Sequence, residues 1–232
     1  MKTLRITSIL LLGIIAANIG RAQTVSSNVT GLLGQRYAEF GLGRVNAYGI
    51  FDEGTFVDAS VNIPVHRNVD LGFGYSYSRT DVQSFSGSLI SPVVNSDELS
   101  GHILSASATV YSGNQGFKPF AGAAIGYEWA QEKLSFTSTF GSSGTRDIKD
   151  DRSIWAIAAG VEIQAGPVTL TPRIAYQDAF SGGNSGAVSL AGEAHLWFTR
   201  TLGGFVHVTY TNPTQSGAES FWSYGAGLRM RF

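Results

Sequence analysis

Three groups of residues in this chain have types and spacings that could perform chemistry. His207-Val208-Thr209 sets an imidazole two residues from a hydroxyl, which could supply the base and the nucleophile of a hydrolytic site. The stretch from Asp147 to Asp151 offers carboxylate oxygens, which hard divalent cations prefer. The third group consists of acidic residues and arginines in one row of alternating segments: Glu39, Asp58, Asp70, Glu128, Glu162, Arg173, Glu193, Arg229 and Arg231.

The spacing of these residues limits what chemistry they can do. Side chains two apart on a strand share a face, so His207 and Thr209 would lie in the same row as the charged residues. No neighbouring segment adds a residue to orient such a base and nucleophile. Asp147 to Asp151 falls among polar residues typical of a solvated loop. We therefore expect no enzyme activity, no metal site and no cofactor, and we expect the charged row to form a structural ion network.

The elements that must position these charges are alternating strands, of which the clearest is FWSYGAGLRMRF, residues 221–232. The apolar row of this segment holds Trp222, Tyr224, Ala226, Leu228, Met230 and Phe232, and the other row is small or cationic. A period of two is that of a β-strand, here with different surroundings on its two faces.

Ten segments alternate in this way and predict ten strands, or eight if residues 35–65 are irregular. The predicted strands are 35–45, 54–65, 68–80, 101–112, 117–130, 153–164, 167–178, 187–199, 203–211 and 220–232. Short turns at 66–68, 113–116, 165–167 and 200–203 alternate with longer loops at 46–53, 81–100, 131–152, 179–186 and 212–219. This alternation is typical of membrane-spanning antiparallel up-and-down β-barrels, with short periplasmic turns and long outer loops.

Composition and the placement of aromatic residues indicate a barrel whose outer face meets lipid. Only 14% of the residues are charged, against roughly 25% in soluble domains. The formal net charge of -1 argues against a nucleic-acid partner. Aromatic residues of the apolar rows fall toward the long-loop ends, as in the girdles of membrane barrels. We expect this lipid-interface girdle to contain Tyr75, Tyr77, Tyr127, Trp129, Trp155, Tyr176, Trp222 and Tyr224.

The N-terminal residues have the pattern of a secretory leader. A cationic start, an apolar stretch and a small-x-small ending predict a cleavable signal peptide over residues 1–22. Residues 23–34 are then expected to be a short N-terminal periplasmic segment, and residues 35–232 the barrel. An even number of strands would place both termini on the periplasmic side of a bacterial outer membrane.

The mature chain resembles the small OmpA/OmpX-like outer-membrane β-barrel family. The resemblance rests on RYAEFGLGRV, VNIPVHRNVDLGFGYSYS, KPFAGAAIGYEW and the terminal GLRMRF, and it covers residues 35–232. Eight strands are commonest in that family, so ten would be a departure. The resemblance implies that Leu228, Met230 and Phe232 form a C-terminal signal for the barrel assembly machinery, and that the partners are outer-membrane lipids and lipopolysaccharide.

The function expected from these features is that of a monomeric, non-enzymatic surface barrel with a side-chain-filled lumen. Its outer loops would serve structural or interaction roles. The alternative is a narrow porin-like channel for water, ions or small solutes, since charged side chains can also line a thin polar path.

Overall fold

The computed structural model describes residues 31–47, 51–82, 93–113, 116–137, 143–181, 186–215 and 220–232. The predicted signal peptide and residues 23–30 lie outside this range. No helix in the described ranges is long and apolar enough to span a membrane.

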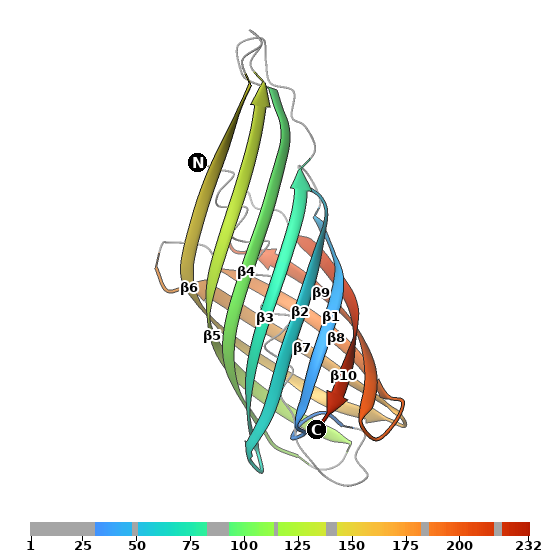
Figure 1. Cartoon of the computed structure of the whole chain (residues 1–232). Helices are drawn as coiled ribbons and strands as arrows, with labels where there is room; N and C mark the ends of the chain where they lie inside the picture. The colour runs from blue at the N-terminus through green and yellow to red at the C-terminus, as the bar shows by residue number, and fades with distance from the viewer. Residues whose placement is uncertain are drawn as a thin grey trace.

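The described chain forms ten antiparallel strands in one closed barrel (Figure 1). The strands are β1 (Tyr37–Ala47), β2 (Phe51–His66), β3 (Val69–Val82), β4 (Val93–Tyr111), β5 (Phe117–Thr137), β6 (Ser143–Ala165), β7 (Val168–Ala179), β8 (Ala187–Trp197), β9 (Leu202–Pro213) and β10 (Phe221–Arg231). Each strand pairs with its neighbours in sequence, and β1 pairs with β10 to close the barrel. The prediction of ten strands is confirmed. Residues 35–65 supply two regular strands, so the eight-stranded alternative is wrong.

The faces of the strands are inverted relative to a soluble barrel. Along β10, Trp222, Tyr224, Leu228 and Met230 are exposed, whereas Ser223 and Arg229 are buried. The same alternation runs through β7, where each buried residue is followed by a more exposed one. An apolar outer surface around the barrel is what a hydrocarbon environment requires, and the polar rows therefore face the lumen.

Three strands are much longer than the others and rise together beyond one end of the barrel (Figure 1). β4, β5 and β6 have 19, 21 and 23 residues, whereas β1, β8 and β10 have 11 each. The loops predicted over 81–100 and 131–152 are therefore too long, because residues 93–100 continue β4 and residues 131–137 and 143–152 continue β5 and β6. We call the part of β4, β5 and β6 beyond the barrel the raised sheet; its edge is Ser143–Ser153 of β6.

Glycine permits a close approach where β10 meets its neighbours. A Cβ atom built on Gly227 would lie 2.5 Å from Cζ of Phe205 and would also clash with the carbonyl oxygen of Phe40. The absence of a side chain at position 227 therefore leaves room inside the barrel for the Phe205 ring.

Candidate functional site

The short-turn end of the lumen is closed by the residues that precede β1. Leu32 and Leu33 are fully buried, and their backbone N–H groups donate to Oε2 of Glu162 at 2.6 and 2.7 Å. Nζ of Lys118 lies 3.4 Å from Oε1 of Glu162 and donates to the carbonyl oxygen of Leu33 at 3.0 Å. We call residues Gly31–Gln35 the N-terminal plug. Glu162 serves as its acceptor, because a carboxylate can satisfy two backbone donors at once.

Further polar contacts hold the N-terminal plug against β2 and β3. The N–H of Gly34 donates to Oδ2 of Asp70 at 3.1 Å, and Nδ2 of Asn62 donates to the carbonyl oxygen of Gln35 at 2.8 Å. Nε2 of Gln35 donates back to the carbonyl oxygen of Gly31 at 2.6 Å, which closes the turn on itself. Asp70 and Asn62 are both buried, so these bonds form away from water. A segment expected to lie in the periplasm thus ends inside the barrel mouth.

A second cluster is centred on Arg229, whose side chain is 0% exposed. Its Nε and Nη2 atoms donate to Oε2 of Glu39 at 2.9 and 2.6 Å, and Nη2 also donates to Oε1 of Glu193 at 2.9 Å. Nη1 lies 3.1 Å from Nδ1 of His195. Because a guanidinium has no acceptor, Nδ1 of His195 must accept this bond. We call Arg229, Glu39, Glu193 and His195 the Arg229 hub.

The Arg229 hub joins the first and last strands. Glu39 on β1 lies directly opposite Arg229 on β10, and the guanidinium continues across β9 to reach β8. The rings of Tyr37 and Phe205 each lie with their centroids 4.8 Å from its Cζ atom. The charge is therefore surrounded by carboxylates, an imidazole and aromatic faces. This arrangement leaves Arg229 without access to solvent where β1 meets β10.

The remaining residues of the predicted ion network are spread over the height of the barrel. Glu128 on β5 is buried and accepts from Nε of Arg152 on β6 at 2.7 Å, nearer the long-loop end. Asp58 on β2 and Arg173 on β7 are also buried and face the lumen. Arg231 lies at the short-turn rim, where its Cζ atom is 3.8 Å from the centroid of Trp197. Among these charges, Glu162 binds the N-terminal plug, Glu39 and Glu193 bind Arg229, and Glu128 binds Arg152.

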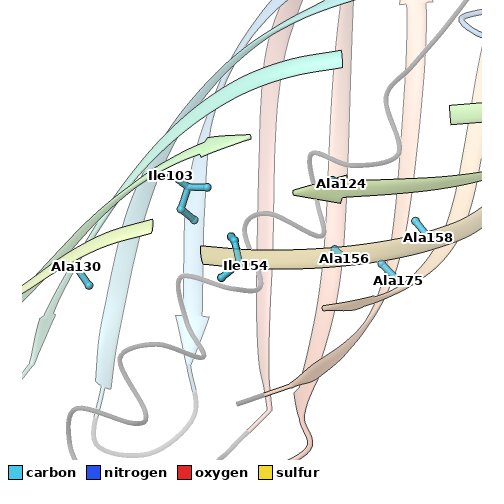
Figure 2. Packing of buried hydrophobic residues seen from close by; sticks show 7 residues of the cluster. All are labelled: Ile103, Ala124, Ala130, Ile154, Ala156, Ala158 and Ala175. Carbon is cyan, nitrogen blue, oxygen red and sulfur yellow. The ribbon is translucent and has the colours of Figure 1, made fainter. Parts of the chain in front are cut away.

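Part of the lumen is lined by apolar side chains. The row of charged residues in the sequence did not predict this apolar part. Ile103, Ala124, Ala130, Ile154, Ala156, Ala158 and Ala175 form one buried cluster on β4 to β7 (Figure 2). Figure 2 shows that most of these side chains are single methyl groups. Small residues line this wall, whereas large buried residues such as Arg229 and Phe205 lie on β10 and β9.

The residues expected at the lipid interface lie on the outer surface. Tyr75, Tyr127, Trp129, Trp222 and Tyr224 are exposed, and Tyr77, Trp155 and Tyr176 are partly exposed. Several of these rings contact one another. For example, the ring centroids of Tyr127 and Trp129 are 4.9 Å apart. The residues of the expected assembly signal, Leu228, Met230 and Phe232, are also exposed and point outward.

The two groups of residues considered for chemistry, His207 with Thr209 and Asp147 to Asp151, lie in the lumen and in β6. His207 and Thr209 are buried in the lumen, and the ring of His207 stacks on Phe56 and Phe205. Asp147 to Asp151 lies in β6 and not in a loop, so that expectation was wrong. In the described part of the chain, no three metal-ligating side chains form a group that could hold an ion.

These features define a ten-stranded barrel of the outer-membrane type, and comparison with solved structures agrees. The chain is similar to the translocator domain of autotransporter NalP from Neisseria meningitidis, with a TM-score of 0.55, 11% identity and coverage of 85% of this chain and 88% of that one. It is similar to the β-domain of the Bordetella autotransporter BrkA, with a TM-score of 0.51, 13% identity and coverage of 85% and 99%. It is also similar to the outer membrane protease OmpT from Escherichia coli, with a TM-score of 0.51, 10% identity and coverage of 85% and 97%.

At such low identity these similarities establish the fold alone. The neighbours include autotransporter domains and a protease, and one fold can carry unrelated functions. No family model matches the chain, and no curated protein matches it. The function must therefore be argued from the lumen and the raised sheet.

Proposed function

We propose that this chain is a non-enzymatic protein of a bacterial outer membrane, in which a filled barrel supports an interaction surface outside the cell. The observation that carries the proposal is the occupied lumen. The N-terminal plug lies at the short-turn end, and the fully buried Arg229 hub lies across the seam. Because neither element leaves its central charge accessible to water, the barrel acts as a scaffold and not as a path for solutes.

In this proposal the short turns and both termini face the periplasm. The raised sheet then stands on the outer side, where lipopolysaccharide and other cells are encountered. Its strands add surface without adding to the membrane-spanning belt, which supports an interaction role. The filled lumen also supports a place among the small OmpA/OmpX-like barrels, from which ten strands are a departure.

The proposed partners follow from the outer surface of the barrel. Lipids and lipopolysaccharide contact the apolar belt and its aromatic girdle, and the barrel assembly machinery binds the last strand through Leu228, Met230 and Phe232. Within its own membrane the barrel is a monomer. No nucleic acid, metal or cofactor takes part.

Conductance across a planar bilayer tests this proposal. The full mature chain should show no stable, discrete conductance. Glu162→Gln should lower the free energy of unfolding by about 1.5 to 3 kcal/mol, because a charged acceptor of two backbone bonds is lost, and conductance should stay near baseline. A discrete cation-selective conductance in the unmodified chain would instead establish the narrow channel. In a channel, Glu162→Gln would shift selectivity and leave stability nearly unchanged, since a hydrated carboxylate tunes passing ions.

A further inference from the structure

One edge of the raised sheet lacks a strand neighbour in the described part of the chain. The whole of β5 pairs with residues Ser143 to Ile163 of β6. On its other side, β6 pairs with β7 only from Ile154 onward. The eleven residues Ser143–Ser153 therefore form an edge beyond the barrel, although the last of them, Ser153, already accepts from the N–H of Phe180 through its carbonyl oxygen. Figure 1 shows β6 at the side of the three long strands. An edge of this length is a template for pairing with another strand.

The hydrogen-bonding direction of this edge follows from the strand period. The carbonyl oxygen of Ser153 accepts from the N–H of Phe180, on the β7 side. The N–H of Gln164 donates to the carbonyl oxygen of Gly116, on the β5 side. Odd-numbered residues of β6 thus direct their backbone groups away from β5. At the edge, the N–H and C=O of Asp147, Lys149 and Asp151 point to where a further strand would lie.

The charges along this edge would face opposite charges if a second copy of the same edge ran antiparallel to it. Residues 146–150 read Arg-Asp-Ile-Lys-Asp, which is positive, negative, neutral, positive, negative. In an antiparallel pair centred on Ile148, Asp147 of one copy would lie opposite Lys149 of the other. Two pairs of opposite charge would form across one two-fold axis, and opposite charges on facing positions stabilise a sheet.

Other pairings of the same edge are less favourable. Centring the antiparallel pair on Lys149 would set lysine against lysine and Asp147 against Asp151. Centring it on Asp150 would oppose Lys149 to Asp151 twice but set Asp150 against itself. Centring it on Asp147 would set that residue against itself. A parallel in-register pair would oppose every charge to its own copy. Like charges directly opposite are destabilising, so the pattern selects the antiparallel register centred on Ile148.

We propose that the β6 edge Ser143–Ser153 binds the same edge of a second copy of this chain, whose barrel lies in a facing membrane. β6 runs from the raised sheet into its own barrel (Figure 1). Antiparallel pairing reverses this direction in the partner, so the two barrels lie at opposite ends of the joined sheet. The overlap of nine residues, 144–152, spans about 30 Å along the strands. The facing membrane depends on the outward orientation given under the proposed function, whereas the pairing itself does not.

Charge exchange in the full mature chain, refolded in detergent micelles, tests the pairing by sedimentation equilibrium. The unmodified protein should dimerise. Asp147→Lys alone and Lys149→Asp alone should each weaken dimerisation by about tenfold or more, because two attractive pairs become repulsive. An equimolar mixture of the two variants should dimerise again, since each pair then regains opposite charges. The double exchange D147K/K149D should also dimerise, and Arg67→Asp, at a short turn, should have no effect.

Cross-linking tests the register independently. The chain has no Cys, and Ile148→Cys would place equivalent residues at a non-hydrogen-bonded pair, where Cα atoms are about 4.5 Å apart. An intermolecular disulfide should therefore form readily. Asp151→Cys should not cross-link to its own copy, because its equivalents lie about 20 Å apart along the strands. A monomer at all concentrations, or a dimer insensitive to these changes, would overturn the proposal.

Vesicles test the facing arrangement. Phosphatidylcholine vesicles carrying Asp147→Lys and others carrying Lys149→Asp should aggregate only when mixed. Failure to aggregate, with the barrels shown to be inserted with the raised sheet outward, would overturn the facing arrangement even if dimers form in detergent. Labelling of the two ends of the barrel in cells reports the orientation separately, so the two proposals can fail independently.

Discussion

Arg229 shows how strongly the role of a charge depends on its depth in this barrel. Its ion pairs with Glu39 and Glu193 are fully buried, whereas Arg79 pairs with Glu98 at 3.1 Å with both side chains partly exposed. Breaking a buried pair leaves an uncompensated charge away from water. An exposed pair loses little, because water and salt already screen it.

We therefore expect Arg229→Met to lower the free energy of unfolding by about 3 to 5 kcal/mol. The variant leaves two facing carboxylates without their shared cation. Urea unfolding of the refolded barrel, followed by tryptophan fluorescence, would measure the change. Arg79→Met is the matched control, with an expected effect below about 1 kcal/mol. Equal effects of the two substitutions would contradict the importance assigned to the hub.

At the scale of the element, a strand in this barrel has one face in lipid and one in the lumen. Ala226 is an exposed residue in the middle of β10, whereas Asn212 is exposed at the long-loop end of β9. Ala226→Arg should reduce the free energy of folding into lipid vesicles by about 2 to 4 kcal/mol, the range for arginine at the bilayer midplane. Asn212→Arg should change it by about 0 to 1 kcal/mol, as expected near an interface. Similar values for both would argue against a lipid belt at Ala226.

Most strands could be predicted because their two surroundings impose a period of two. The apolar row of β10 and the buried row around Arg229 were both visible in the residue order. Beyond the barrel this signal disappears. Ser143–Ser153 of β6 has no apolar row in its sequence, and its polar residues were interpreted as a loop.

The site was predictable in its composition but not in its pairings. Periodicity placed Glu162 in the lumen, but its partners Leu32 and Leu33 lie about 130 residues away and were assigned to a periplasmic segment. Only the apolar pair Leu32-Leu33 between glycines hinted that this segment is buried. Which arginine meets which glutamate depends on the register of closure, and period-two patterns do not encode that register.

At the scale of the whole molecule, the proposed orientation can be tested by labelling. Cysteine variants at Ser181, beyond β7, and at Arg67, in the β2–β3 turn, place one thiol at each end of an otherwise cysteine-free barrel. Both side chains are exposed, so differences in reactivity reflect the membrane barrier. In intact cells a membrane-impermeant maleimide should label Ser181→Cys and leave Arg67→Cys unlabelled. Permeabilised cells should give equal labelling, and the reverse pattern in intact cells would invert the orientation.

The pairing of Glu39 with Arg229 also has a consequence for how fast the barrel folds. The two residues are 190 positions apart, and the pairing of β1 with β10 to which they belong closes the longest loop between paired strands in the described chain. Closing so long a loop is entropically expensive and gives the barrel a high contact order, which slows folding. Until β10 docks, Glu39 and Glu193 have no arginine between them. Closure of the seam is therefore expected to be the slow step, and it can occur only after the last strand has been synthesised.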